Sequence, residues 1–364
     1  MIERRSILLY PFSLIWRFIT GFRNFLYDSE ILHSHEFKVP VICVGNLVTG
    51  GTGKTPHAGY LVELLMKEFN VAFLSRGYKR KTRGFVLAGP ASQVSDIGDE
   101  PMQIHRKYPG ITVAVDGNRV RGVNKILKER PDTGIIILDD GFQHRRITPG
   151  LSILLSGCER LMTRDHLLPY GNLRESIHNM VRADIILITK SPEDLSPIQR
   201  RLIVKEVNKA PYQNLYFTAF TYKDPVPVFD NINYNAEQFK AFESADRGIV
   251  LVTGIANPKP LHEYLQRSFS EIIRLPFSDH HRFTGKDVNR ILEALNSLKS
   301  PVKYVLTTEK DAVRLREFTN IAESFRSSFY YVPVDIHFLN DDKEEFDNLI
   351  IDYVRKNKRD NRIS

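Results

Sequence analysis

Cysteine and tryptophan are scarce in this chain, and it has no low-complexity tract or internal repeat. Its 364 residues include two cysteines and one tryptophan. Cys43 and Cys158 both lie in apolar, strand-like segments, so we interpret them as small core residues in a reducing compartment rather than as a disulfide. Cysteine and histidine do not cluster at the spacings of a metal site. The sequence therefore disfavours a disulfide-stabilised secreted domain.

The charge balance indicates an anionic partner without choosing one. Lysine and arginine total 51 against 43 aspartate and glutamate, a net charge of +8. This balance suits a nucleotide, a nucleic acid, a phosphorylated substrate or an anionic membrane. With 42% hydrophobic and 26% charged residues, the chain has the composition of a soluble globular protein and a length that suits two domains.

A glycine-rich loop between an expected strand and an expected helix is the most specific motif. Residues 39–44 are apolar and partly β-branched, and residues 57–69 are apolar at helical spacing. In a phosphate-binding P-loop the backbone N–H groups surround a polyphosphate, a lysine reaches the β- and γ-phosphates, and a threonine hydroxyl binds Mg²⁺. The usual pattern has glycine where this chain has valine. We predict a nucleotide site made of Val48, Thr49, Gly50, Gly51, Thr52, Gly53, Lys54 and Thr55.

Residues 4–27 predict a basic amphipathic helix that starts near Pro11. Helical spacing gives an apolar face with Phe12, Ile15, Ile19, Phe22 and Leu26, and a polar face with Ser13, Arg17, Thr20 and Asn24. Arg17 and Arg23 make the segment a poor transmembrane span, and no small-residue cleavage site of a signal peptide follows it. Such a helix suits the membrane interface, and the alternative is a helix packed against its own domain.

Strand-like segments alternate with helical ones, which predicts an α/β architecture. We expect a P-loop NTPase-type fold with a mostly parallel sheet flanked by helices, a second, smaller α/β domain and the N-terminal helix. Residues 211–239 are rich in Tyr, Phe and Pro and break the pattern. The expected divisions are an interfacial helix over 1–28, a P-loop domain over 29–212, an extended linker or hinge over 213–245, a second domain over 246–354 and a disordered charged tail over 355–364.

Acidic residues at an expected strand end complete the nucleotide site. The apolar run 135–138 ends in Asp139-Asp140, and open α/β sheets place ligands at the carboxyl ends of their strands. A carboxylate there would hold Mg²⁺ directly or through water. Asp99-Glu100 suits a base, a metal ligand or simply the first turn of a helix. On the residues alone, His280 and His281 are equal candidates for a catalytic histidine, and a structural role suits both.

Taken in order, these motifs resemble the bacterial tetraacyldisaccharide 4′-kinase (lipid A 4′-kinase) family over about residues 5 to 335. Valine in place of the P-loop glycine is typical of that family. The resemblance rests on Val44 to Leu47, Gly53 to Pro56, Ser75 to Tyr78, Gly98 to Pro101, Asp139 to His144, Leu168 to Glu175, Asp279-His280 and Thr308 to Val313.

The resemblance implies an ATP-dependent kinase that phosphorylates the 4′-hydroxyl of the tetraacylated lipid A disaccharide 1-phosphate. Asp99 would take the hydroxyl proton with His280 as its partner, and Lys54 would neutralise charge on the phosphoryl group. Thr55 and Asp139 would hold Mg²⁺, with Glu100 and Asp140 as further metal candidates. The positions expected around the disaccharide and its phosphate are Tyr78, Arg119, Gln143, Arg174 and Glu175.

The resemblance also implies a location and a motion. A substrate with several acyl chains stays in the bilayer, so the enzyme would bind the cytoplasmic face of the inner membrane through its N-terminal helix, with no protein partner. The proposed base pair would come from both domains, which predicts an open nucleotide-free form in which Asp99 and His280 lie too far apart to hydrogen-bond.

Two other classes remain as alternatives. A membrane-associated P-loop switch protein is one, but a GTPase is expected to have Asn-Lys-x-Asp after a strand, and both Thr189-Lys190 and Glu309-Lys310-Asp311 lack the asparagine. A nucleic-acid-binding ATPase is the other, and outside the N-terminal helix no basic run is interleaved with aromatic residues at stacking spacing. We therefore expect no nucleic acid partner.

Overall fold

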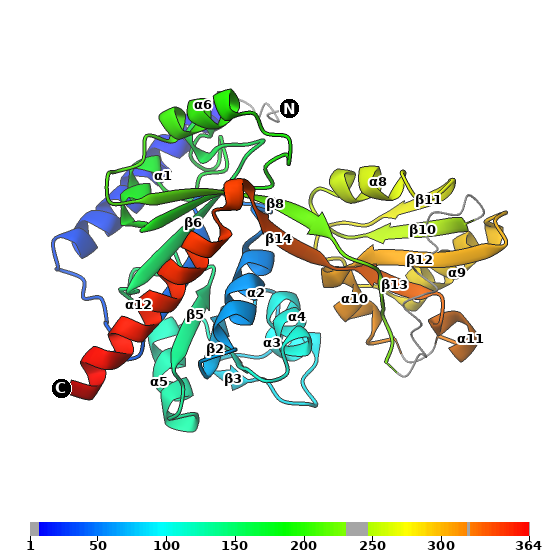
Figure 1. Ribbon diagram of the computed structural model, residues 1–364, viewed down its shortest axis with the longest axis horizontal. Helices are drawn as coiled ribbons and strands as arrows, with labels where there is room; N and C mark the ends of the chain where they lie inside the picture. Colours follow the sequence, from blue (N-terminus) through cyan, green and yellow to red (C-terminus); the bar gives the residue numbers. More distant parts are fainter. Residues whose placement is uncertain (1–6, 231–246, 319–320, 364) are drawn as a thin grey trace. The chain divides into compact units, whose positions relative to one another are not determined.

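The computed structural model describes residues 7–230, 247–318 and 321–363 (Figure 1). The chain forms two compact units, each assembled from separate stretches of sequence. Unit 1 comprises Met1–Pro90, Ile104–Phe220 and Ile336–Ser364, and unit 2 comprises Ala91–Gln103 and Thr221–Asp335.

Unit 1 contains a nine-stranded sheet in the order β14-β8-β7-β6-β1-β5-β2-β4-β3. Strands β1 and β5 pair in parallel with Val44 opposite Asp139, so the end of β1 and the end of β5 lie side by side. Most other neighbours are also parallel, and β3 is antiparallel to β4. The strands are β1 (Val41–Asn46), β2 (Val71–Ser75), β3 (Val86–Leu87), β4 (Thr112–Val115), β5 (Ile135–Asp139), β6 (Leu151–Gly157), β7 (Ile185–Thr189), β8 (Asn214–Tyr222) and β14 (Val334–Phe338).

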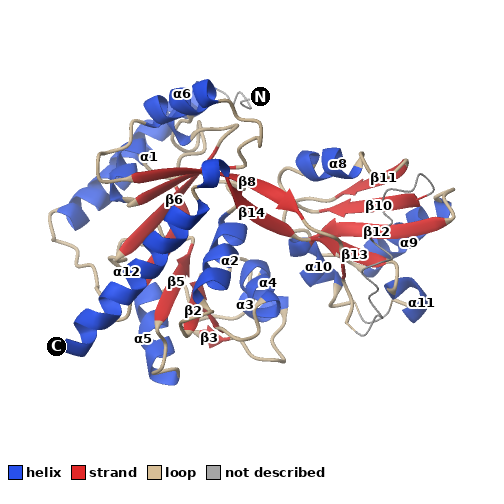
Figure 2. Cartoon of the chain, viewed as in Figure 1, coloured by secondary structure: helices blue, strands red, loops and turns tan. Residues whose placement is uncertain are grey.

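Helices cover both faces of this sheet (Figure 2). Helices α2 (Lys54–Leu65) and α12 (Lys343–Ile363) pack on one face, and α5 (Arg119–Glu129) packs on the other. Helix α6 (Pro197–Val207) packs in one hydrophobic cluster with residues of β6, β7 and β8. Helix α1 (Tyr10–Asp28) follows a short 3₁₀ turn over Ile7–Leu9, with proline in its first turn as predicted.

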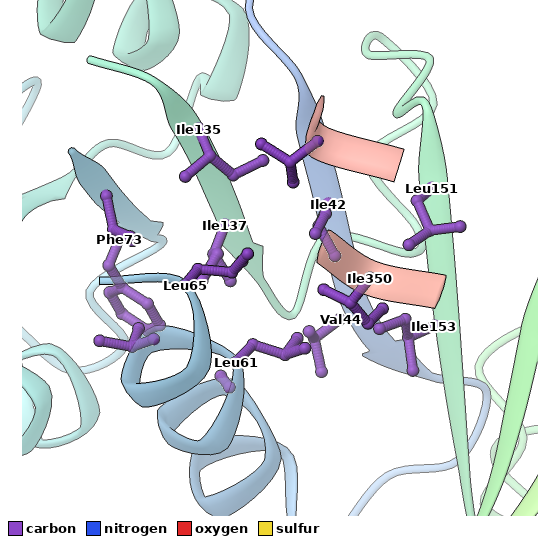
Figure 3. Close-up of a cluster of buried hydrophobic side chains, with 14 of the residues drawn as sticks. Ile42, Val44, Leu61, Leu65, Phe73, Ile135, Ile137, Leu151, Ile153 and Ile350 are labelled. Atoms are coloured by element: carbon purple, nitrogen blue, oxygen red, sulfur yellow. The ribbon is translucent and has the colours of Figure 1, made fainter. Parts of the chain in front are cut away.

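The main core of unit 1 is formed by alternate residues of fully buried strands. Ile42 and Val44 of β1 point to the same side as Ile135 and Ile137 of β5, and Leu61 and Leu65 of α2 pack onto them, as does Ile350 of α12 (Figure 3). Parallel strands buried on both faces have continuous apolar sequences, as β1 and β5 do. This burial fixes which strand ends meet at the nucleotide loop.

Unit 2 has its own five-stranded sheet in the order β11-β10-β12-β13-β9. It is parallel apart from β9, which is antiparallel to β13. The elements are β9 (Val226–Pro227), β10 (Arg247–Thr253), α8 (Lys259–Leu265), β11 (Glu271–Pro276), α9 (Gly285–Ser297), β12 (Val302–Thr308), α10 (Glu309–Leu315), α11 (Glu323–Arg326) and β13 (Phe329–Val332). Helix α3 (Val94–Ile97) and the first half of α4 (Asp99–Lys107) also belong to this unit.

The unit boundaries differ from the divisions expected from the sequence. The expected linker begins as β8, a full member of the nine-stranded sheet, and its residues 231–245 lie outside the described residues. The C-terminal helix belongs to unit 1, and it continues to Ile363 through the expected tail. Residues 91–103 belong to unit 2. Sequence order suggested these divisions, whereas the buried contacts that define a unit are made between distant segments.

Replacing Phe346 tests whether the C-terminal helix α12 packs in the core of unit 1. Its side chain is 1% exposed and lies in the unit 1 core with Tyr216 and Phe338. We expect Phe346→Ala to lower the free energy of unfolding by about 3–5 kcal/mol, because the cavity cannot close fully. Denaturant unfolding measures this loss. Asn348→Ala on the exposed side of the same helix should change stability by less than about 0.5 kcal/mol, and equal losses would contradict this packing.

Candidate active site

The P-loop joins the end of β1 to the start of α2 in unit 1. Gly50 and Gly53 have φ values of 108° and 86°, in the left-handed region that favours glycine. Asn46 donates from Nδ2 to Thr52 Oγ1 at 2.8 Å, and Lys54 Nζ donates to Asn46 Oδ1 at 3.3 Å. The loop therefore has a fixed shape, with Lys54 at the first position of a helix, where backbone N–H groups can bind an anion.

Val48 occupies the position where the usual P-loop pattern has glycine, and packing explains it. Val48 is 5% exposed and lies in a core cluster with Leu47, Phe142 and Leu173. It forms an antiparallel bridge with Leu173, and the neighbouring Thr49 N–H donates to Asn172 O at 2.8 Å. The segment 168–175 therefore packs against the P-loop and hydrogen-bonds to it. These contacts join two motifs that lie far apart in the sequence.

Asp139, at the carboxyl end of β5, is held from two sides. Its side chain accepts a hydrogen bond from Ser75 Oγ at 3.1 Å, and its backbone oxygen accepts one from Arg119 Nη2 at 3.3 Å. Arg119 is only 3% exposed and also donates to Asp116 O at 3.0 Å. Burial lowers the pKa of Arg119. This arrangement favours a positioning role for Arg119 beneath Asp139 over contact with a bound disaccharide.

Asp140 pairs with two cations beside the P-loop. Arg174 Nη1 donates to its carboxylate at 2.9 and 3.0 Å, and Lys54 Nζ lies 3.7 Å from Oδ1. Burial alone raises the pKa of Asp140, but the charges of Lys54 and Arg174 outweigh it and hold the pKa below its usual value. The φ of Asp140 is 47°, an uncommon backbone state for a residue with a side chain. Its carboxylate therefore organises Lys54 and Arg174.

Gln143 and Glu175 connect this network to helix α1. Gln143 Nε2 donates to Asn46 O at 2.8 Å, and Gln143 Oε1 accepts from Arg174 Nη1 at 3.1 Å. Glu175 is fully buried and accepts hydrogen bonds from Asn24 Nδ2 at 2.9 Å and Arg182 Nη2 at 2.7 Å. Glu175 thus anchors α1, whereas Tyr78, another expected substrate contact, is 56% exposed.

A basic cavity of about 270 Å³ adjoins Gln143 in unit 1. Burial and the charge of Arg119 lower the pKa of His144 in its wall to about 4. The signal that could have pointed to this cavity was the run His144-Arg145-Arg146. The lining residues are Arg23, Tyr27, Gly117, Asn118, Gln143, His144, Arg145 and Arg146.

Helix α1 has its polar face turned inward. Ser13, Thr20 and Asn24 are its buried residues, while the large apolar side chains are exposed, with Phe18 at 74% and Phe22 at 54%. Ser13 Oγ donates to Leu167 O at 3.0 Å and Trp16 Nε1 donates to Arg174 O at 2.9 Å. The apolar face is thus not what holds α1 to unit 1. Among the described residues, no helix combines the length and the apolar character needed to cross a bilayer.

Asp99 and His280 lie together in unit 2. His280 Nδ1 is 2.7 Å from Asp99 Oδ2, and the two side chains are 13% and 9% exposed. The expectation that they come from different domains is wrong, because both lie in unit 2. Residues 91–103 pack within unit 2, where Val94 N donates to Glu317 Oε1 at 2.9 Å. His281 makes a different contact, 3.0 Å from Asp287.

Two cations of α10 complete this cluster, Lys310 and Arg314, and neither was among the expected site residues. Arg314 donates to both oxygens of Asp99, with Nε 2.9 Å from Oδ1. Lys310 Nζ lies 3.1 Å from His280 Nε2 and 3.6 Å from Glu100 Oε1. Glu100 therefore belongs to this cluster in unit 2, whereas Thr55 and Asp139 belong to unit 1. The signal was the motif Thr308 to Val313, which contains Lys310 and ends next to Arg314.

Comparison with known proteins identifies the family. The family model described as tetraacyldisaccharide-1-P 4′-kinase matches residues 5–355. The tetraacyldisaccharide 4′-kinase of Bacteroides thetaiotaomicron is 45% identical over 363 residues, covering 98% of this chain and 95% of that protein. The enzyme of the same name from Phocaeicola vulgatus is 44% identical, covering 98% and 97%. The chain belongs to this family.

A solved structure supports the same assignment at the level of the fold. LpxK from Aquifex aeolicus, described as the "apo" form in complex with ATP, superposes with a TM-score of 0.73 at 26% identity, covering 95% of this chain and 98% of that one. The comparisons confirm the expected family, the P-loop α/β fold and the tetraacyldisaccharide 4′-kinase activity.

The contact between Asp99 and His280 generates a prediction for this kinase. We expect Asp99→Ala and His280→Ala each to lower kcat by roughly 10²- to 10⁴-fold, the range for loss of a general base. Because the two side chains act as one hydrogen-bonded unit, the double variant should cost much less than the product of the single losses. Steady-state kinetics measures this. His281→Ala is the matched control, and a loss equal to that of His280→Ala would contradict the assignment.

Proposed function

We propose that the protein transfers the γ-phosphate of ATP to the 4′-hydroxyl of a tetraacylated disaccharide 1-phosphate while bound to the cytoplasmic face of the inner membrane. One observation carries the membrane part of this proposal. The polar face of α1 is hydrogen-bonded to unit 1 and its apolar face is exposed, so the helix presents Phe18 and Phe22 outward. A helix with this pattern suits the interface of a bilayer.

The P-loop supports ATP as the donor. Its glycines allow the backbone to turn close to a polyphosphate, and the side chain of Lys54, 18% exposed, stands at the start of α2. Arg174 and Lys54 already bind the carboxylate of Asp140. We propose that the ammonium group of Lys54 contacts the γ-phosphate of bound ATP. There it would stabilise the negative charge that develops on the phosphoryl group during transfer.

Thr55 and Asp139 fit a magnesium ion. Hydroxyl and carboxylate oxygens are the hard ligands that Mg²⁺ prefers, and this ion usually takes one or two protein ligands besides phosphate and water. No group of three or more acidic, histidine or cysteine side chains suited to a metal occurs in the described part of the chain. When bound, the ion would neutralise charge on the β- and γ-phosphates. We leave out Glu100 and Asp140, because nearby cations engage their carboxylates.

Each unit has one feature that suits the chemistry of the acceptor. The basic cavity lined by Arg23, Arg145 and Arg146 suits a sugar phosphate, and it adjoins the C-terminal half of α1. The Asp99–His280 pair would receive the proton of the 4′-hydroxyl as the hydroxyl attacks. Acyl chains that remain in the bilayer would lie along the apolar face of α1.

Transfer of labelled γ-phosphate tests the function directly. With a tetraacylated glucosamine disaccharide 1-phosphate in detergent micelles, we expect one phosphate to be added at the 4′ position, located by mass spectrometry and NMR. The Lys54→Ala variant should be slower by orders of magnitude at unchanged fold. Equal transfer by this variant would remove Lys54 from its role, and ATP turnover independent of the acylated acceptor would contradict the kinase assignment.

The apolar face of α1 generates a second prediction. The rings of Phe18 and Phe22 stack at 6.2 Å between centroids and are mostly exposed. Because burying one such side chain contributes about 1.5–3 kcal/mol, replacing both with serine should weaken partition into anionic lipid vesicles at least tenfold. Sedimentation with vesicles measures this, and Tm should stay unchanged because both rings face outward. Val302→Ser in unit 2 is the control, and full binding by the double variant would place the membrane contact elsewhere.

A further inference from the structure

The turn that follows β7 contacts the P-loop and has no part in the mechanism above. Thr189 is fully buried, and its Oγ1 donates to Thr52 O at 2.8 Å. Lys190 comes next, and its Nζ lies beside Gly51, since a Cβ placed on that glycine would be 3.8 Å from Nζ. The turn therefore meets the P-loop just before Lys54.

The backbone of Lys190 is fixed on both sides. Ser191 is 4% exposed, its N–H donates to Thr218 O at 2.9 Å, and its Oγ donates to Ile188 O at 3.0 Å. Lys190 itself has a φ of 55°, an uncommon state for a residue with a side chain that is often found at functional sites. With Thr189 and Ser191 both bonded to neighbouring segments, the Lys190 side chain leaves the backbone in a set direction.

Phe220 of β8 contacts both this turn and the P-loop. The Lys190 Nζ lies 5.6 Å from the centre of the Phe220 ring. The same ring packs on Gly53, because a Cβ on that glycine would be 2.7 Å from Phe220 Cζ. His57 joins β8 to the loop as well, with Nδ1 2.7 Å from Gly53 O and Nε2 2.9 Å from Thr218 Oγ1. The apolar surface beside Lys190 is thus fixed to the P-loop.

The ammonium group of Lys190 is a donor that lacks an acceptor within the described part of the protein. Among residues 7–230, 247–318 and 321–363, no hydrogen bond or ion pair involves its Nζ. Burial lowers the pKa of Lys190, and the charge of Glu159 offsets this only in part. A charged donor that is partly removed from water is stabilised by an acceptor. The position therefore favours an oxygen of a ligand as the partner of Nζ.

The place of this turn in the sheet indicates which part of a nucleotide it meets. Ligands of open α/β sheets bind at the carboxyl ends of the strands, and in P-loop enzymes the metal ion bridges the β- and γ-phosphates. The terminal phosphates would thus lie toward Asp139 at the end of β5. Strand β5 pairs with one side of β1, and β6 and β7 lie on the other side. A nucleotide bound across the end of β1 would therefore have its ribose and base on the side of Lys190.

We propose that Lys190 is a nucleotide-binding residue: its ammonium group donates to an oxygen of the ribose, and its aliphatic chain packs against the base beside Phe220. The proposal rests on the ATP-dependent function above and names the residue that holds the nucleoside part of the nucleotide. A lysine side chain has methylene groups along its length and donors only at its end. This suits a base along the chain and a sugar oxygen at its end, while Lys54 contacts the phosphates.

The first test measures binding to the full chain without acceptor. The two ligands are ADP and inorganic pyrophosphate, which has two linked phosphates as ADP does but no nucleoside. We expect Lys190→Ala to weaken ADP binding by about tenfold or more, the range for loss of a charged donor, and pyrophosphate binding by less than about threefold. Isothermal titration calorimetry measures both. A loss for ADP below about threefold, or an equal loss for pyrophosphate, would overturn the proposal.

Two further variants test the chemistry of the contact and its place. Lys190→Met keeps methylene groups and removes the ammonium group, so we expect it to bind ADP more tightly than Lys190→Ala and more weakly than the wild type. Lys205→Ala is the matched control, because Lys205 is an exposed lysine of α6 in the same unit. Wild-type ADP binding by Lys190→Met, or a loss in the control equal to that of Lys190→Ala, would contradict the assignment.

Kinetics separates this inference from the proposed function. We expect Lys190→Ala to raise KM for ATP by about tenfold or more, with kcat and the KM for the acylated acceptor within about threefold, because Lys190 contacts no transferring group. If the wild type binds ADP through Lys190 but transfers no phosphate to the disaccharide, the proposed function fails and the nucleoside contact stands. If the wild type transfers phosphate and Lys190→Ala leaves both ADP affinity and KM for ATP unchanged, the function stands and the inference is wrong.

Discussion

A carboxylate removed from water must meet a positive charge, and this constraint organises both units of the protein. The buried Glu175 is bound by Arg182 and the buried Asp99 by Arg314, and the partly exposed Asp140 is bound by Arg174. Burying an unpaired carboxylate costs several kcal/mol, so the two buried acids are stable only in the geometry that their arginines provide. The contacts that stabilise these acids also fix the orientation of their carboxylates. Asp140 in turn contacts Lys54, and Asp99 contacts His280.

In unit 1 this constraint connects the outer helix to the phosphate loop. Asn24 of α1 bonds Glu175, Gln143 bonds both Glu175 and the backbone at Asn46, and Arg174 joins Gln143 to Asp140. Ser13 and Trp16 of α1 also form hydrogen bonds to unit 1, to Leu167 O and Arg174 O. Its apolar side is left outward.

Local pattern was enough to predict the nucleotide loop, the fold class and the strand that ends in Asp139. Continuous apolar strands, glycines at the turn and Lys54-Thr55 at the helix start each reflect a requirement that acts over a few residues. Local pattern could not separate His280 from His281, and the family resemblance alone selected His280. It also could not show that Arg119 and Glu175 are buried, since 3% and 0% exposure result from packing against distant segments.

The sequence by itself determined the elements, the phosphate chemistry and the amphipathic character of α1. Only the tertiary structure decided which side of α1 faces outward, why valine replaces glycine at position 48, and that Asp99 shares a unit with His280 and Arg314. The physical reason is the distance along the chain over which each interaction acts. Periodicity and loop chemistry act between neighbours in the chain, whereas Arg314 and Asp99 are 215 residues apart and meet only because a buried charge requires a partner.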